Sequence, residues 1–213
     1  MRSRGVTPRF ITLEGGEGVG KSTQLARLAE ALRGRGVDLL TTREPGGSPG
    51  AEAIRQLILT GDDAKITPRA EALMFAAART DHVERTIRPA LAQGRWVLCD
   101  RFLDSSRAYQ GVAGSLGDAD ILAMHQLGSG GFLPDRTLIL DLPDSVAADR
   151  ADRRDGGAAD RIGGRGSDYH GKVRQAFRDF AAAEPERFRL IDASGTPDDV
   201  SARLMAALSD YLQ

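Results

Sequence analysis

The chain has 213 residues, of which 41% are hydrophobic and 28% are charged, and its formal net charge is −1. This length favours a single domain that buries roughly 70% of the surface of its unfolded chain. A net charge near zero excludes a molecule-wide field that attracts nucleic acid or an acidic membrane, while the excess of arginine over lysine leaves room for local anion sites.

Strand-like and helix-like patterns alternate along the chain. Short apolar and β-branched runs predict strands at 9–14, 38–43, 96–100, 136–141 and 188–192. Helical spacing and capping residues predict helices at 21–34, 49–59, 69–92, 118–128, 145–153, 168–183 and 197–211. The alternation is typical of an α/β fold with a five-stranded parallel sheet and helices on both faces. We expect residues 1–213 to form one domain.

The cysteine content and the apolar runs predict the cellular location. Cys99 has no second cysteine to pair with, and its place in an apolar run predicts a packed strand thiol. Residues 1–8 lack the apolar stretch of a signal peptide, and no run approaches the ~18 apolar residues of a membrane span. We therefore expect a cytoplasmic protein that is not inserted in a membrane.

The most informative motif follows the first predicted strand. The sequence GGEGVGKS at 15–22 matches G-x-x-x-x-G-K-[ST], the phosphate-binding P-loop, and lies between a strand and a helix. Backbone N–H groups of such a loop surround a phosphate, Lys21 can reach the β- and γ-phosphates, and Ser22 can bind Mg²⁺. The alternative is a glycine-rich turn with a coincidental Lys-Ser pair. The residues predicted to hold the nucleotide are Gly15, Gly16, Glu17, Gly18, Val19, Gly20, Lys21, Ser22 and Thr23.

Two further motifs follow strands and are expected at the same edge of the sheet, because the carboxyl ends of parallel strands lie together. Asp100 and Arg101 end the third strand, where the carboxylate can hold Mg²⁺ and the guanidinium can clamp a phosphate. The alternative is a strand-end ion pair. After the second strand, the sequence REPGG at 43–47 holds Arg43 in a restricted loop suited to an anion, although a plain Pro-Gly turn explains its last three residues equally well.

Two side chains of the predicted helix 69–92 share a face. Phe75 and Arg79 are four residues apart, so the ring can stack on a nucleobase while the guanidinium donates to a base carbonyl. The alternative places Phe75 in the core with Arg79 extending beside it to solvent. The three histidines, His82, His125 and His170, match no ligand spacing, and we expect them at the surface or on helix faces.

Residues 154–167 contain five glycines and three arginines. This composition predicts a mobile loop that neither packs in a core nor forms a regular element. Such a loop can bring arginines to a transferring phosphoryl group. The alternative is a solvated charged loop. The arginines in question are Arg154, Arg161 and Arg165 in this segment and Arg153 immediately before it.

Together these motifs resemble those of bacterial thymidylate kinases. The resemblance is carried by EGGEGVGKST at 14–23, TREPGG at 42–47, DRF at 100–102, SSRAYQG at 105–111 and DRI at 160–162, and it extends from Phe10 to about Leu212. It implies a P-loop kinase fold with a lid at about 150–167. It also implies transfer of the γ-phosphoryl group of ATP to dTMP, giving dTDP, with Mg²⁺ as a cofactor. The family resemblance further implies a homodimer, while the net charge near zero leads us to expect no nucleic acid partner.

The resemblance assigns roles to individual positions. The catalytic residues it implies are Lys21, Glu17, Arg101, Arg153 and Arg161, and the metal ligands are Ser22 and Asp100. The implied contacts to dTMP are Glu17 at the 3′-hydroxyl, Arg43 and Arg101 at the phosphate, Phe75 and Arg79 at the thymine, Ser106 and Gln110 in the base pocket, and Tyr109 where a 2′-hydroxyl would lie.

Two positions relate to the lid. Gly18 stands where eukaryotic-type enzymes carry a P-loop arginine, so the chain resembles the class whose catalytic arginines come from the lid. Gly163 departs from the acidic residue that commonly follows the Asp-Arg-Ile motif, so lid docking can differ from that of the family.

Three other classes share the P-loop. A regulatory GTPase needs an N/T-K-x-D segment, and neither Lys65 nor Lys172 lies in one. A motor or transporter ATPase needs a signature for sandwiching nucleotide, which the sequence lacks. A deoxynucleoside kinase needs a base near a 5′-hydroxyl, whereas this chain offers arginines suited to a phosphate already present.

Overall fold

The computed structural model describes residues 7–60, 65–143, 145–147 and 161–212. Within them, five parallel strands form one sheet in the order β2-β3-β1-β4-β5. The strands are β1 (Phe10–Glu14), β2 (Leu39–Arg43), β3 (Trp96–Asp100), β4 (Arg136–Asp141) and β5 (Phe188–Asp192). The predicted α/β architecture is confirmed, and each predicted strand agrees with the observed one to within one residue at either end.

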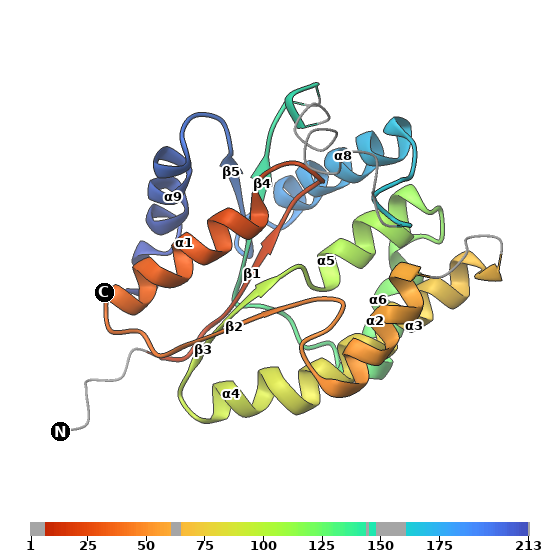
Figure 1. Cartoon of the computed structure of the whole chain (residues 1–213), viewed down its shortest axis with the longest axis horizontal. Helices are drawn as coiled ribbons and strands as arrows, with labels where there is room; N and C mark the ends of the chain where they lie inside the picture. The colour runs from red at the N-terminus through yellow and green to blue at the C-terminus, as the bar shows by residue number, and fades with distance from the viewer. Residues whose placement is uncertain (1–6, 61–64, 144, 148–160, 213) are drawn as a thin grey trace.

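Helices cover both faces of the sheet (Figure 1). One face is covered by α1 (Lys21–Gly34) and α9 (Pro197–Ala206), which pack on Ile11, Leu13 and Leu98. The other face carries Phe10, Val97 and Cys99, so alternate strand residues point to opposite cores. Cys99 is a buried thiol in this second core, as predicted.

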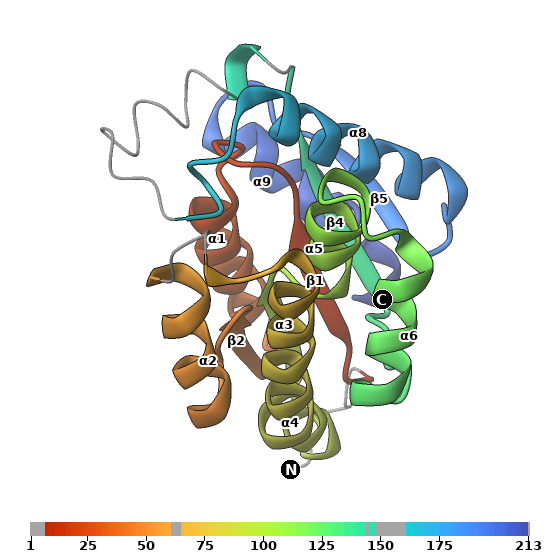
Figure 2. The ribbon, with the colours of Figure 1, turned by 90° about the vertical axis from the view of Figure 1, so that its right-hand side faces the viewer.

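Several helices cover the second face of the sheet. They are α3 (Pro68–His82), α4 (Arg88–Ala92), α5 (Leu103–Ser106), α6 (Asp118–Ser129) and α8 (Ser167–Ala183). In addition, α2 (Pro49–Thr60) packs along α3, and α3 packs along α6 (Figure 2). The helix α3, which carries Phe75 and Arg79, is thus held between two others.

The predicted helix 69–92 is interrupted. Residues Val83–Ile87 form the π-helical segment η2, where the Arg88 N–H bonds to the Val83 carbonyl five residues earlier. Pro89 has no N–H to donate to the carbonyl four residues earlier, and a wider turn accommodates that loss. The predicted helix 197–211 likewise ends early, at Ala206, and is followed by a short 3₁₀ turn, Ser209–Tyr211.

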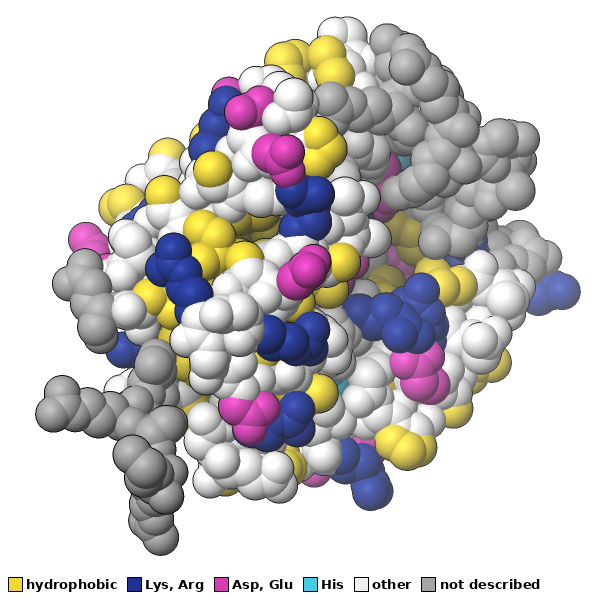
Figure 3. Space-filling view, turned by 60° about the vertical axis from the view of Figure 1, so that its left-hand side comes forward, with side chains coloured by type: hydrophobic (Ala, Val, Ile, Leu, Met, Phe, Trp, Pro, Cys, Tyr) yellow, Lys and Arg dark blue, Asp and Glu magenta, His cyan; other side chains and the backbone are white. Residues whose placement is uncertain are grey.

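A helical segment that was not predicted follows β3. It consists of α5 and the π-helical η3 (Arg107–Ala113) and contains the SSRAYQG sequence. Of the predicted helix 145–153, residues 145–147 are helical and the rest lies outside the described residues. No helix in the described part of the chain is both long and apolar enough to cross a membrane. On the face drawn in Figure 3, basic and acidic side chains are interspersed, and several Lys and Arg side chains gather beside a hollow.

Candidate active site

A pocket of about 510 Å³ lies at the carboxyl edge of the sheet, where β1, β2 and β3 end. It collects residues from four predicted motifs that are far apart in the sequence. The predicted residues that line it are Glu17, Gly18, Gly20, Lys21, Ser22, Thr23, Arg43, Phe75, Arg79, Asp100, Arg101, Ser106, Tyr109 and Gln110. Gly15 and Gly16 lie behind this wall, and Val19 is packed in the core beneath α1.

The P-loop connects β1 to α1, as its motif requires. Gly15 has a φ of +136°, and a Cβ there would lie 2.5 Å from the Leu140 carbonyl oxygen, so this position needs glycine. The Lys21 ammonium donates to the carbonyls of Gly15 and Gly16, at 3.0 and 2.6 Å. Burial, together with the nearby charge of Arg101, lowers the pKa of Lys21 to about 8. The loop therefore holds its lysine inside the curve that a phosphate would occupy.

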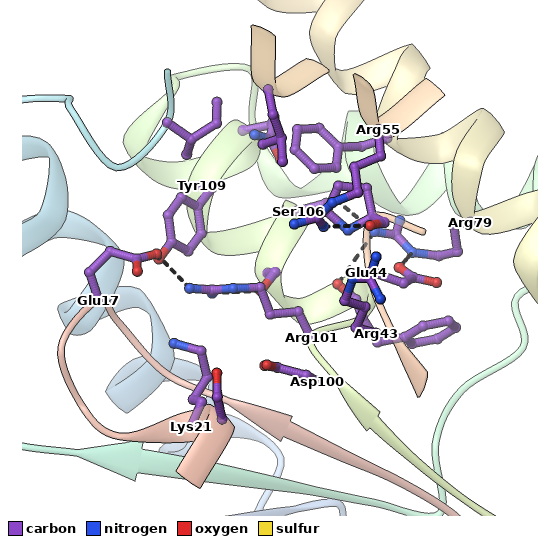
Figure 4. A pocket seen from close by; sticks show the side chains of 18 of the residues that line it. Glu17, Lys21, Arg43, Glu44, Arg55, Arg79, Asp100, Arg101, Ser106 and Tyr109 are labelled. Atoms are coloured by element: carbon purple, nitrogen blue, oxygen red, sulfur yellow. Dashed lines mark hydrogen bonds and ion pairs between the residues drawn. The ribbon is translucent and has the colours of Figure 1, made fainter. Parts of the chain in front are cut away.

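Arg101 lies at the centre of the pocket (Figure 4). Its Nη2 donates to Glu17 Oε1 at 2.6 Å, and its Nη1 donates to the Gly15 carbonyl and to Ser105 Oγ, both at 3.1 Å. The Tyr109 hydroxyl donates to the same Glu17 oxygen at 3.1 Å, and the guanidinium carbon lies 5.0 Å from the Tyr109 ring centre. Arg101 adopts a left-handed backbone with a φ of +66°. Its ion-pair partner is thus Glu17 from the P-loop.

Asp100 and Ser22 form the predicted metal site. Both line the pocket, and Asp100 Oδ1 is buried without a hydrogen-bond partner among the described residues. Since burying an unpaired carboxylate oxygen is unfavourable, a cation would supply the missing partner. No group of three or more His, Cys, Asp or Glu side chains in the described ranges could enclose a metal. This donor set fits Mg²⁺, which binds through one or two protein oxygens together with phosphates and water.

The REPGG loop brings Arg43 and Glu44 to the pocket. Glu52 on α2 holds this loop, because it accepts from Arg43 Nη2 at 3.0 Å and from the Gly47 N–H at 2.9 Å. The peptide bond between Glu44 and Pro45 is cis. Arg55, which the sequence interpretation missed, also lines the pocket and donates to the Pro45 carbonyl at 2.6 Å.

Arg79 is fixed by a buried network. Its Nε donates to Glu44 Oε2 at 2.8 Å, and its Nη2 donates to Ser106 Oγ at 2.7 Å. His82 Nδ1 lies 3.0 Å from the other Glu44 oxygen, and His82 Nε2 lies 2.7 Å from Thr42 Oγ1. Arg79 is 3% exposed, so the alternative in which it extends to solvent is wrong. Phe75 is half-buried and lines the pocket.

The three histidines lie in helices, one of the two places predicted for them: His82 in α3, His125 in α6 and His170 in α8. His82 and His125 are buried rather than at the surface, because each has polar partners inside the protein. Burial lowers the pKa of His125, whose Nε2 lies 2.8 Å from the Phe132 carbonyl. His170 is partly buried, with Nε2 3.1 Å from the Gly163 carbonyl.

The end of the arginine-rich loop docks on α3. Glu71 accepts from Arg161 Nη1 at 2.7 Å, from Arg165 Nη2 at 2.6 Å and from Gln110 Nε2 at 2.9 Å. Ile162 is buried beside Tyr109, so the expectation that this segment cannot pack in a core is wrong for its described end. An isoleucine side chain that finds an apolar pocket outweighs the glycine-rich surroundings. Arg153 and Arg154 lie outside the described residues.

Glu14, at the end of β1, links the P-loop to the segment after β3. Its carboxylate accepts from the Phe102 N–H at 2.7 Å and from Ser105 Oγ at 2.6 Å. Complete burial, together with the nearby charge of Asp104, raises the pKa of Glu14 to about 7. Sequence reasoning missed the roles of Glu14, Glu44 and Glu71, although Glu14 and Glu44 lie within quoted motifs. The available signal was the position of Glu14 and Glu44 beside predicted strand ends.

Known proteins resemble this chain over nearly its whole length. The family model for thymidylate kinase matches residues 13–204. A thymidylate kinase from Rhizorhabdus wittichii is 59% identical over 96% of this chain and 98% of its own length. One from Bradyrhizobium diazoefficiens is 53% identical over 96% of this chain and 90% of its own. The crystal structure of thymidylate kinase from Ehrlichia chaffeensis has a TM-score of 0.76 and 31% identity, covering 95% of this chain and 98% of that one.

Proposed function

This chain belongs to the thymidylate kinase family and transfers the γ-phosphoryl group of ATP to dTMP, and we propose that the pocket at the carboxyl edge of the sheet is where this transfer takes place. The observation that carries the proposal is that the P-loop and the predicted base-contacting residues line one continuous cavity. Its volume of about 510 Å³ lies within the range of small-molecule sites. Donor and acceptor phosphates can therefore meet inside it.

We assign the donor side to the P-loop. Its backbone N–H groups and the start of α1 receive the ATP phosphates, and Lys21 stabilises the charge that moves between the β- and γ-oxygens. Ser22 and Asp100 would hold Mg²⁺, since Asp100 Oδ1 lacks a partner among the described residues. Mg²⁺ held there would neutralise part of the negative charge of the phosphates.

We assign the acceptor phosphate and sugar to the centre of the pocket. Arg101 and Arg43 bind the dTMP phosphate, because both present guanidinium groups to the cavity from neighbouring strand ends. Glu17 accepts from the sugar 3′-hydroxyl. Tyr109, which is hydrogen-bonded to Glu17, occupies the space of a 2′-hydroxyl and so selects deoxyribose.

The base pocket offers one donor and one acceptor. Arg79 Nε and Nη2 are engaged by protein acceptors, so Nη1 is the nitrogen that we assign to a thymine carbonyl. Gln110 Oε1 is buried without a hydrogen-bond partner among the described residues, and it matches the thymine N3–H. Phe75 stacks on the ring, and Ser106 orients Arg79. Thymine satisfies both groups, whereas cytosine presents a donor to Arg79 and an acceptor to Gln110.

We further propose that lid arginines complete the transition-state site. Gly18 supplies no cation, so the developing charge is met by Arg153 and Arg161. In the described conformation Arg161 donates to Glu71 and to the Ile58 carbonyl, beside the pocket wall formed by Ile162. Arg161 therefore needs to release Glu71 in order to reach the phosphates.

The finer assignments of assembly and location are also proposals. We propose a homodimer, supported by the exposed leucines of α3 and α6, which lie side by side: Leu73, Leu122 and Leu127. Such apolar side chains are typical of a surface covered by a partner. We propose a cytoplasmic location, supported by a single cysteine that is buried as a free thiol.

Substrate competition tests the proposed assignments. With ATP as donor, kcat/KM should be highest for dTMP, lower for dUMP by about the value of one methyl group, and far lower for dCMP, UMP and AMP. Arg79→Ala should lose most of the thymine preference while KM for ATP changes little. Comparable kcat/KM values for dTMP and for AMP or CMP would contradict the assignment of the base pocket.

A further inference from the structure

Glu71 is buried on α3, one turn before Phe75 and two turns before Arg79. Glu71 is not one of the residues that line the pocket, and it is hydrogen-bonded to Gln110, which does line it. Three groups donate to Glu71: Gln110 Nε2 to one oxygen, and Arg161 and Arg165 to the other. A carboxylate that receives two guanidinium groups acts only as an acceptor.

We propose that Glu71 determines which end of the Gln110 amide faces the base, and thereby selects thymine over cytosine. This proposal deepens the proposed function and rests on it. The amide has one donor end and one acceptor end, and either can face the pocket after a half-turn. Because Glu71 accepts at 2.9 Å, Nε2 is held on the Glu71 side and Oε1 is left for the ligand. Oε1 is the atom that lacks a partner among the described residues.

The arginines at the end of the lid keep Glu71 in this role. Arg165 is itself held by the Tyr169 hydroxyl, to which its Nη1 donates at 2.7 Å, and that hydroxyl donates to the Tyr109 carbonyl. If Arg161 leaves Glu71 to reach the phosphates, Arg165 still donates to the carboxylate. The orientation of Gln110 thus persists during the reaction, and Glu71 is a positioning residue that acts through Gln110.

Glu71→Gln gives a directional test. The oxygen of the new amide is needed by the arginines, so its NH₂ faces Gln110, and Gln110 then has to turn its own oxygen toward residue 71. An N–H donor would then meet the thymine N3–H. The ratio of kcat/KM for dTMP to that for dCMP should fall by about tenfold or more, while KM for ATP changes little. An unchanged ratio in the folded variant would overturn the proposal.

Glu184→Gln is the matched control. Glu184 also lies between two arginines, accepting from Arg107 at 2.9 Å and from Arg187 at 3.0 Å, and it lies outside the pocket. This variant also loses a carboxylate that two arginines share, although a more exposed one, without touching Gln110. Its dTMP-to-dCMP ratio should equal that of the wild type. An equal fall in both variants would contradict a specific role for Glu71.

A reciprocal exchange tests the direction of the bond. In Glu71→Gln combined with Gln110→Glu, the amide at 71 donates to one carboxylate oxygen at 110, and the other oxygen faces the base as an acceptor. The thymine preference should recover relative to Glu71→Gln alone. A double variant as unselective as the single one would overturn the proposal.

Hydrogen exchange in the wild-type chain provides a measurement that does not depend on the folding of a variant. With dTMP bound, the Gln110 side-chain amide protons, identified by NMR through their loss in Gln110→Met, should exchange slowly because Nε2 stays bonded to Glu71. Fast exchange would refute the orientation. Failure of the proposed function itself would look different, because the wild type would then show no preference for dTMP over dCMP.

Discussion

At the scale of single residues, Lys21 is the charge on which phosphoryl transfer depends most. Lys21→Ala should abolish transfer and leave the fold intact, because the ammonium stabilises charge moving between the β- and γ-oxygens. The loss should fall mainly on kcat, measured in steady-state assays, with circular dichroism to confirm folding. A folded variant that keeps more than about a tenth of the wild-type kcat would show that Lys21 lacks this role.

The lowered pKa of Lys21 gives a second prediction at this scale. In the free enzyme the pKa is about 8, so the ammonium loses its proton and its charge as the pH rises above that value. The kcat/KM for ATP reports the free enzyme and should fall above about pH 8. Bound phosphates raise the pKa of Lys21, so kcat should fall only at higher pH. Lys21→Arg should retain its residual kcat/KM across this range, and an identical decline in that variant would assign the pH dependence to another group.

At the scale of elements, the REPGG loop depends on a glycine that leaves room for the Arg79 network. Gly47 has a φ of +85°, and a Cβ there would collide with His82 Nε2 and Thr42 Oγ1. Gly47→Ala should lower the free energy of unfolding by about 1–3 kcal/mol in urea titrations and raise KM for dTMP more than KM for ATP. Gly36→Ala is the control, because Gly36 has a φ of +81° but nothing near its Cβ position. If both substitutions changed KM for dTMP equally, the REPGG loop would have no specific role in supporting the base pocket.

The lid arginines are tested at the same scale. Arg161→Ala and Arg153→Ala should each lower kcat by ~10³ if they act as arginine fingers. Arg189→Ala, in β5 and away from the pocket, serves as the control and should keep the wild-type kcat. Losses below about tenfold for both lid variants would refute catalysis by the lid.

The elements also show what sequence patterns can and cannot predict. The five strands were predictable because each is a short apolar run beside a turn. The helical segment 103–113 was missed because its buried residues are mixed and form no apolar stripe. Asp104, Ser106, Arg107 and Gln110 are buried beside Leu103, Ala108 and Tyr109. A search for apolar periodicity cannot detect such a segment.

The candidate site was also predictable only in part. Motif residues could be predicted because their spacing along the chain carries the signal. A position beside a strand end could have drawn attention to Glu44, but not to its partner. Glu44 meets Arg79, and Glu71 meets Gln110 and Arg161, only after the chain has folded. Residues that hold the site in place are therefore less visible in a sequence than those that line it.

At the scale of the whole molecule, the exposed leucines predict assembly. Leu127 on α6 is 91% exposed, and Leu73 on the adjacent α3 is 56% exposed. We expect a dimer mass for the wild type by analytical ultracentrifugation and a monomer mass for Leu127→Glu, because a charge in a buried apolar interface is unfavourable. Leu190→Glu, on the edge strand β5, should remain dimeric. A monomeric wild type would contradict the proposed homodimer.

The contacts of Lys21 with its own loop have a consequence for how the whole molecule takes up its nucleotide. Before any ligand arrives, the ammonium is already solvated by two loop carbonyls. A nucleoside triphosphate replaces them and also engages the loop N–H groups and the start of the helix. Release of Lys21 from the two loop carbonyls is therefore part of nucleotide binding.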